Sequence, residues 1–190
     1  MAHRRSWLIT LVAALAAAIL SATPAAADPT SAPAAPYCGI TWGSQPKEIA
    51  WSGVEGTLST VRAGKHDCFD RLVIDVRGPN RNGVSVRYES PLWTPDGTPV
   101  YLRGGASLYI GVPASAFDTE TGELVFAPAN PTELVDVTGW RTFRQVSHLG
   151  GHLLYNEFGL GVRARLPFRV IALDLDSGGT RLVIDVAHAW

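Results

Sequence analysis

The chain is poor in cysteine: Cys38 and Cys68 are the only two among its 190 residues. We find no further ligands at metal-binding spacing around either residue, which excludes a thiolate-rich metal site. In an oxidising compartment such a pair is most simply one disulfide, worth roughly 3 to 4 kcal/mol in the chain-entropy picture. The residues before Cys38 also lack a lipobox, so we do not expect a lipoprotein.

Long apolar runs are missing except at the N-terminus. There, residues 3–5 are basic, residues 7–20 are apolar, and the alanines at 25–27 offer an A-x-A cleavage site. This is the layout of a secretory signal peptide, and the apolar run is shorter than the ~20 residues of a membrane span. We therefore predict a signal peptide over residues 1–27, secretion, and no membrane span. The arginine pair leaves twin-arginine export as the alternative to the general secretory route.

Excess charge of either sign is also absent. The chain has 16 Lys and Arg against 17 Asp and Glu, a formal net charge of −1, and loss of the two arginines with the signal peptide leaves −3. A nucleic-acid partner would need a clustered basic face, so we expect none. Residues 28–36 are small and proline-rich, which predicts a flexible spacer before a single domain over residues 37–190.

Helical periodicity is missing as well, and short alternating runs take its place. Residues 83–90 alternate cleanly, with Val84, Val86 and Tyr88 on one face. Glycine, proline and asparagine separate this run from many others of similar length. The pattern predicts an all-β sandwich of short, mostly antiparallel strands.

One hexapeptide, RLVIDV, occurs twice, at Arg71–Val76 and at Arg181–Val186. In each copy Leu, Ile and the last Val share one strand face, and Arg, Val and Asp share the other. If the copies are antiparallel neighbours, each Arg faces an Asp, and each such pair contributes roughly 0.2 to 1 kcal/mol. A parallel pair would place like charges together. We predict antiparallel partners, or pseudo-symmetric strands of two sheets, and not a duplicated active site.

The repeat lies in a wider pattern. The stretch WGSQPK…TVRAGKHDCFDRLVIDV (Trp42–Val76) and the closing TRLVIDV (Thr180–Val186) resemble the AMIN-like domain of secreted actinobacterial proteins. The resemblance covers most of residues 40–187 and implies a β-sandwich. Related AMIN domains of cell-wall amidases and secretins are non-catalytic and direct their proteins to peptidoglycan. The two blocks lie farther apart here, so we expect an inserted region between residues 92 and 165.

The clearest polar cluster is GKHDCFDR, where His66 stands beside Asp67 and Asp70. It is interpreted in three ways: a general base with an orienting carboxylate, a ligand contact, or a polar turn pinned by Cys68. No nucleophile partner and no G-x-S-x-G elbow accompany it. We predict no catalytic residue, keep His66 and Asp67 as ligand-binding candidates, and regard a hydrolase as the least favoured alternative.

Aromatic and basic side chains supply the other candidates. Among the tryptophans, Trp93 in the turn-rich stretch PLWTPDG is the first that we expect to be exposed, and aromatic faces stack on sugar rings. Arg163 and Arg165 alternate, so we expect them to share one strand face and to bind carboxylates. The alternative for both arginines is a solvated surface paired with nearby acids.

His148 and His152 are four residues apart, but HLGGH lacks the Glu of a zinc-protease motif. We expect a hairpin turn at Gly150–Gly151 with one histidine on each strand, and we predict no metal and no cofactor. The leading hypothesis is a secreted, non-catalytic cell-envelope module that recognises peptidoglycan or another wall glycan, with an anionic wall polymer as a further partner. The alternative is docking of another secreted protein through a sheet edge or the inserted region.

Overall fold

The structure is a computed structural model that describes residues 36–53, 56–78, 83–118, 120–152 and 154–190. The expected signal peptide and all of the expected spacer except Pro36 lie outside the described residues. Proposals about those segments therefore rest on the sequence alone.

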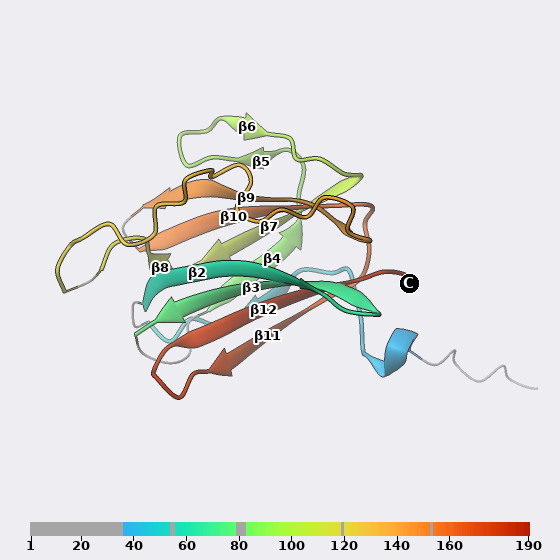
Figure 1. Ribbon diagram of the computed structural model, residues 1–190, viewed down its shortest axis with the longest axis horizontal. Coiled ribbons are helices and arrows are strands. Elements are labelled where there is room, and N and C mark those ends of the chain that lie inside the picture. Colours follow the sequence, from blue (N-terminus) through green and yellow to red (C-terminus); the bar gives the residue numbers. More distant parts are fainter. Residues whose placement is uncertain (1–35, 54–55, 79–82, 119, 153) are drawn as a thin grey trace, which may run out of the picture. The chain divides into compact units, whose positions relative to one another are not determined.

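Short alternating runs form strands throughout the described chain, as the sequence predicts (Figure 1). The elements are η1 (Tyr37–Gly39), β1 (Lys47–Ile49), β2 (Gly56–Lys65), β3 (Phe69–Arg77), β4 (Val84–Tyr88), β5 (Leu92–Trp93), β6 (Pro99–Val100), β7 (Ala106–Val112), β8 (Ala114–Ser115), β9 (Phe143–His152), β10 (Tyr155–Val162), β11 (Phe168–Asp174) and β12 (Thr180–Ala187).

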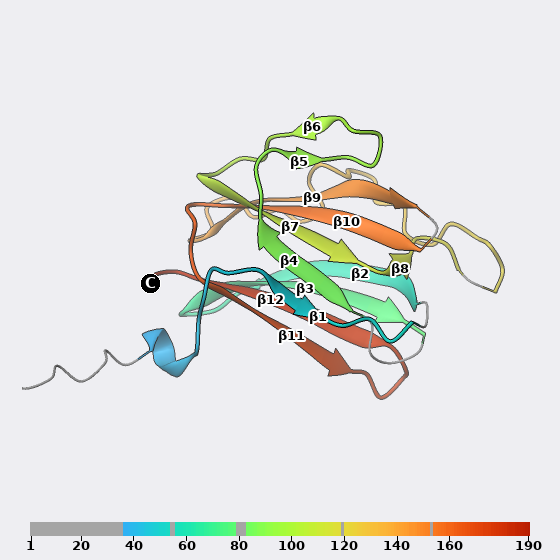
Figure 2. The ribbon, with the colours of Figure 1, turned by 180° about the vertical axis from the view of Figure 1, so that it is seen from behind.

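The strands form two five-stranded sheets that face each other (Figures 1 and 2). One sheet has the order β1-β4-β7-β10-β9, and the other has the order β11-β12-β3-β2-β8. The pairs are antiparallel except for β2 with β8, which are parallel. Leu72 and Ile74 of β3 and Leu182 and Ile184 of β12 are fully buried between the sheets. The predicted all-β sandwich is confirmed. It forms because one face of the strands carries the apolar residues that fill the core.

The segment between the two family-like blocks is part of the sandwich. Residues 92–165 supply β7, β9 and β10, which are central and edge strands of one sheet. They also supply the β5–β6 hairpin, which lies over the outer face of β9 and β10 (Figure 1). The segment does not form a lobe of its own.

Glycines let this hairpin approach the sheet. A Cβ atom at Gly159 would lie 2.7 Å from a methyl carbon of Leu92, and one at Gly161 would lie 2.2 Å from the carbonyl oxygen of Arg103. Real Cβ atoms do not come that close to other atoms, so a side chain at Gly161 would displace backbone and one at Gly159 would displace leucine methyl groups. Leu92 and Leu149 form a small second core beneath the hairpin.

The two RLVIDV copies are antiparallel partners, which confirms the first of the two predicted arrangements. β3 and β12 pair with Arg71 opposite Asp185 and Asp75 opposite Arg181. Arg71 donates from Nε to Asp185 Oδ1 at 2.6 Å and from Nη2 to Oδ2 at 2.8 Å. Arg181 donates from Nε to Asp75 Oδ1 at 2.8 Å. The charged residues of the repeat therefore fix the register of the central strands.

Candidate functional site

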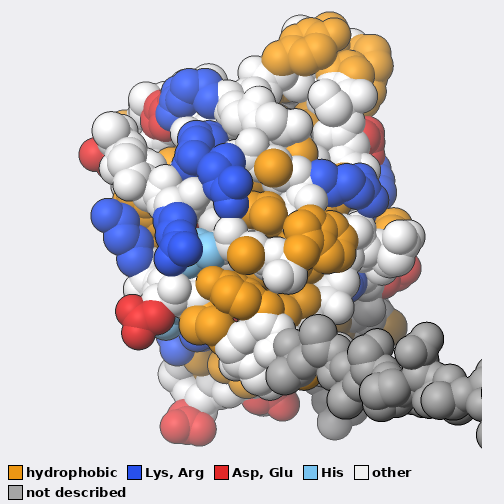
Figure 3. Space-filling model, turned by 90° about the vertical axis from the view of Figure 1, so that its right-hand side faces the viewer, with side chains coloured by type: hydrophobic (Ala, Val, Ile, Leu, Met, Phe, Trp, Pro, Cys, Tyr) orange, Lys and Arg blue, Asp and Glu red, His pale blue; other side chains and the backbone are white. Residues whose placement is uncertain are grey.

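The end of the sandwich that carries the C-terminus gathers loops from distant parts of the sequence (Figure 1). These are the β2–β3 turn, residues 139–142 before β9, residues 163–167 after β10, and the tail after β12. Backbone hydrogen bonds join them: Arg163 N donates to Thr142 O, and His188 N donates to Cys68 O. Figure 3 shows Lys and Arg side chains gathered beside hydrophobic ones on this surface, which we call the end face.

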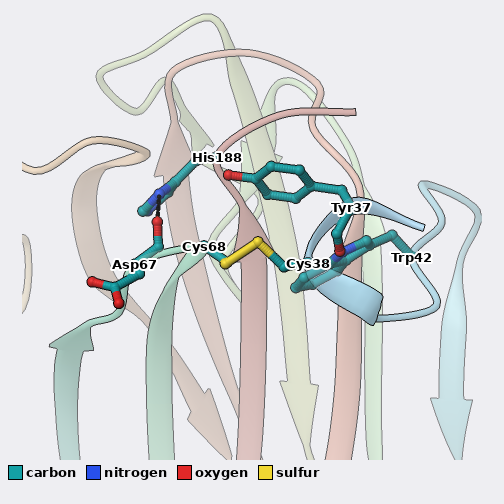
Figure 4. Close-up of a disulfide and its surroundings, with 6 residues drawn as sticks. All are labelled: Tyr37, Cys38, Trp42, Asp67, Cys68 and His188. Carbon is teal, nitrogen blue, oxygen red and sulfur yellow. Dashed lines mark hydrogen bonds between the residues drawn. A yellow bond between two sulfur atoms is a disulfide. The ribbon is translucent and has the colours of Figure 1, made fainter. Parts of the chain in front are cut away.

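A buried polar lock holds the end face together. Asp70 is 1% exposed, and its Oδ2 accepts hydrogen bonds from the backbone N–H groups of Thr142 at 2.7 Å and Phe143 at 2.9 Å. Its Oδ1 lies 3.1 Å from Nε2 of His188. The other ring nitrogen, Nδ1, lies 3.1 Å from the backbone oxygen of Asp67 (Figure 4). Acceptors therefore occupy both ring nitrogens of His188, which leaves neither free to act as a general base.

The β2–β3 turn is also tied to the N-terminal segment. Cys38 and Cys68 form the predicted disulfide, which joins η1 to this turn (Figure 4). Trp42 Nε1 donates to the backbone oxygen of Tyr37 at 2.8 Å and closes the short segment around η1. The turn that carries His66 is thus fixed on one side by a covalent bond and on the other by His188.

A hollow of about 340 Å³ opens beside the lock, and we call it the end hollow. Its walls are Lys65, His66, Asp67, Asp70, Gly139, Arg141 and His188. Within the described residues Arg141 makes no hydrogen bond or ion pair, and Lys65 has its Nζ 5.2 Å above the ring of Trp140. Two cationic groups therefore line the hollow with donors available to a ligand.

A second hollow, of about 590 Å³, adjoins the first at Gly139. Its charged side chains already have hydrogen-bond partners within the chain. Arg103 forms an ion pair with Glu133 and donates to the backbone oxygen of Arg144, and Arg144 donates to the backbone oxygen of Trp140 at 2.8 Å. The end hollow is smaller, but its cations are better placed to receive an anionic group.

The structure brings together some of the candidate residues from the sequence and separates others. His66 and Asp67 line the end hollow. Arg163 lies on the end face and donates from Nη2 to the backbone oxygen of His188 at 2.8 Å. Trp93 is 47% exposed, as expected, but it lies on β5 in the hairpin above β9.

Arg163 and Arg165 do not share a strand face, so that prediction is wrong. β10 ends at Val162, and the chain bends there because Arg163 N donates to Thr142 O and Leu166 N donates to Ala164 O. Arg165 donates to the backbone oxygen of Ser44 at 3.1 Å, and its guanidinium lies 4.6 Å from the centre of the Tyr88 ring. Its side chain packs against the chain and lines a different hollow.

His66 does not form the acid–base pair that one interpretation of its cluster requires. Its ring stacks on Phe69, with the ring centroids 4.5 Å apart, and no hydrogen bond joins it to a carboxylate among the described residues. The carboxylate of Asp70, which would orient it, is already bound to two backbone N–H groups and to His188. The cluster is therefore held by stacking and by the bonds of Asp70, and it borders the end hollow.

His148 and His152 both lie on β9, and the expected turn between them is wrong. His152 pairs with Tyr155, so Gly150 and Gly151 extend the strand beside a bulge. The His148 ring lies 2.9 Å from Oδ1 of Asn156, and burial lowers its pKa against the raising effect of that bond. Among the described residues no three His, Cys, Asp or Glu side chains gather as a metal site.

The lock between Asp70 and His188 was missed at the level of sequence, although its signal was present. The antiparallel register of the repeat pairs Val186 with Asp70 and Ala187 with Phe69. Continued by one residue, it places His188 opposite Cys68, beside the polar cluster. When two copies of a repeat pair antiparallel, a polar residue that follows one copy is therefore a candidate partner for a polar residue that precedes the other copy.

A comparison with known protein families finds a match that covers most of the sandwich. A family model of the AMIN-like domain matches residues 56–188, which is more than half of the chain and extends from β2 to β12. The match includes the end hollow and the segment between the two repeat copies. No curated protein matches the chain. No helix in the described ranges is long and apolar enough to cross a membrane.

Proposed function

The chain belongs to the AMIN-like domain family, and from this premise we propose that it is a secreted, non-catalytic module that binds peptidoglycan or another wall glycan. Family membership suggests the coarser role of a cell-envelope-related binding module. The Cys38–Cys68 disulfide supports an oxidising location, where such bonds persist. The signal peptide expected over residues 1–27 supports the same location.

The end hollow is the observation that carries the proposal. Arg141 and Lys65 present cationic donors on a rigid rim, and Asp67 adds an exposed carboxylate as acceptor. Peptidoglycan offers the matching groups, because its stem peptides carry carboxylates and its sugars carry hydroxyl and amide groups. A guanidinium binds a carboxylate with two parallel hydrogen bonds, which gives both strength and orientation.

The non-catalytic part of the proposal rests on how the polar groups at this end are used. Both ring nitrogens of His188 face acceptors, and Asp70 is saturated by backbone donors. His66 stacks on Phe69. A general base needs a free nitrogen or oxygen that can reach a substrate proton, and the lock removes His188 and Asp70 as candidates.

The test is co-sedimentation of the purified protein with isolated peptidoglycan, before and after its anionic polymers are removed, at low and moderate salt. We expect saturable binding that persists at moderate salt and after the anionic polymers have been removed from the peptidoglycan. Arg141→Ala should weaken binding about tenfold, because it deletes one charge-assisted pair. Arg77→Ala is the matched control, since Arg77 is exposed at the opposite end of β3.

The outcomes separate function from site. If Arg141→Ala binds like Arg77→Ala, the end hollow is not the binding site. If the wild-type protein binds neither preparation, the wall-binding function is wrong.

A second function, docking of another secreted protein, is supported by one observation. A mainly apolar hollow of about 400 Å³ lies beside the edge strand β1. Its lining includes Ile49, Tyr155, and the exposed side chains of Trp51 and Leu154. Failure to bind either wall preparation would make this surface the next to test.

A further inference from the structure

The outer face of the sheet β11-β12-β3-β2, the side turned away from the core, carries a set of arginines that we call the arginine face. Its members come from four neighbouring strands: Arg62, Arg71, Arg169 and Arg181. The register places these side chains on one side, because Arg71 is opposite Asp185 and Asp185 is opposite Arg169.

The four arginines surround two carboxylates. Asp185 accepts from Arg71 and also from Arg169, whose Nε lies 2.7 Å from Oδ2. Asp75 accepts in the same way from Arg181 and from Arg62. Each cluster contains two guanidinium charges and one carboxylate charge, so each retains one net positive charge.

This excess goes beyond what strand pairing requires. The cross-strand pairs of the repeat are complete with Arg71 and Arg181 alone, yet β2 and β11 each contribute a further arginine. The side chain of Arg62 is 45% exposed and that of Arg169 is 28% exposed, whereas Asp185 is fully buried. The guanidinium groups therefore cover the carboxylates and turn their own outer edges to solvent.

Two of the arginines, Arg71 and Arg169, are also held against aromatic rings. The guanidinium carbons of Arg71 and Arg169 lie 5.1 and 5.3 Å from the centre of the Phe69 ring, and that of Arg169 lies 5.5 Å from the ring of Trp42. Their Nη1 atoms make no hydrogen bond to a described residue. Ordered arginines with unused N–H groups lose little rotamer entropy when an anion binds.

The neighbours on this face carry no compensating negative charge. Within the described parts of the four strands, the other outward positions near the clusters are neutral: Thr60, Gly64, Val73, Ile171, Leu173 and Val183. Arg71 and Asp75 are four residues apart, so the clusters are spaced by about 13 Å at 3.3 Å per residue. The face is therefore a row of two cationic centres on the outer side of one sheet.

We propose that the arginine face binds a linear anionic polymer of the cell envelope, through phosphodiester or carboxylate groups spaced along its backbone. The inference rests on the proposed envelope location. The disulfide also favours such an oxidising location, where a wall polymer is a more accessible anion than nucleic acid. The first cluster adjoins the end hollow, because His66 lines the hollow and stacks on Phe69. A polymer attached to peptidoglycan would thus reach both surfaces.

The test measures binding of the purified full chain to three probes: poly(glycerol phosphate), polygalacturonate, and single-stranded DNA of similar charge. The key variant is Arg62→Gln with Arg169→Gln. It removes the excess charge and leaves Asp75 with Arg181 and Asp185 with Arg71. The charge-matched control is Arg87→Gln with Arg103→Gln, which removes two arginines paired with glutamates away from this face. Thermal unfolding confirms that both double variants fold.

We expect the key variant to lose at least about tenfold in affinity for one of the two envelope-type polymers, and to show a weaker salt dependence. The control should stay within about twofold of wild type. The phosphate and carboxylate probes identify which anion is recognised. Equal losses in both variants, no loss in the key variant, or equally tight binding of DNA would each overturn the proposal.

Binding to polymer-stripped peptidoglycan keeps this inference separate from the proposed function. Wild-type binding to stripped peptidoglycan without binding to either polymer would overturn the inference alone. Polymer binding that the key variant loses, without any binding to stripped peptidoglycan, would support the inference and contradict the proposed function.

Discussion

Replacing Asp185 with Asn tests how the repeat holds the sandwich together. The carboxylate is fully buried and accepts from both Arg71 and Arg169. Removing one partner of a buried ion pair costs about 3 to 5 kcal/mol. Here both arginine side chains are 28% exposed and can turn to water, so we expect a lower cost of about 2 to 3 kcal/mol.

The matched comparison is Asp75→Asn in the second cluster. Its carboxylate is 13% exposed, and its partners Arg62 and Arg181 are 45% and 38% exposed. Pairs this open to solvent contribute about 1 kcal/mol or less each. The two variants have the same change of charge and lie on the same face, so the difference between them reports burial.

The assay is urea unfolding at neutral pH, since urea does not screen charges as guanidinium chloride does. We expect Asp185→Asn to lower the free energy of unfolding by about 1 to 2 kcal/mol more than Asp75→Asn. That difference corresponds to about 2 to 8 °C in Tm for a domain of this size. If Asp75→Asn costs as much as Asp185→Asn or more, the reasoning from burial is wrong.

Three further predictions concern pH and packing. Burial raises the pKa of Asp75, but hydrogen bonds from Arg181 and Arg62 outweigh burial, and the net pKa lies below its ordinary 3.8. The ionised Asp75 therefore contributes folding stability that is present above pH 3.8 and is lost as the pH falls through the lowered pKa. Asp75→Asn should flatten the acid limb of a pH–stability curve. Burial lowers the pKa of His148 below 6.5. As the pH drops below 6.5 the unfolded chain binds the proton first, so the free energy of unfolding falls. His148→Gln should reduce the slope of stability against pH in this range, and an unchanged slope would contradict the prediction. Gly161→Ala should destabilise more than Gly159→Ala in thermal unfolding, because its Cβ meets backbone at 2.2 Å and the other meets side-chain methyl groups at 2.7 Å or more.

The parts of the fold that the sequence predicts are those set by local periodicity and charge. Alternation at Val84, Val86 and Tyr88 identifies a strand because one buried face requires period two. The repeat predicts its own register, since only the antiparallel pairing places Arg71 opposite Asp185. The disulfide follows from a count of cysteines. Each of these inferences depends on residues close in sequence or on a pattern that specifies its own partner.

The parts that were wrong or missed depend on contacts between distant segments. Gly150–Gly151 has turn-forming composition, but pairing with β10 extends β9 past it. Arg163 and Arg165 alternate as in a strand, but the chain bends after Val162, where Arg163 N donates to Thr142 O and Leu166 N donates to Ala164 O. Tertiary hydrogen bonding decided both cases, and local propensity carries no information about it.

The candidate site was only partly accessible from the sequence for the same reason. His66 and Asp67 were identified as a polar cluster, and the structure adds Arg141 from a loop far along the chain and His188 from the C-terminal tail. Trp93 was correctly expected to be exposed, but exposure does not say which surface a residue joins. The grouping into an end hollow required the fold.

The central claim, that this domain binds the bacterial wall, is tested most directly by sedimenting the wild-type protein with peptidoglycan stripped of its anionic polymers at moderate salt. The account predicts saturable binding that Arg141→Ala weakens about tenfold and Arg77→Ala leaves unchanged. Wild-type protein that stays in the supernatant at every peptidoglycan concentration would contradict the account.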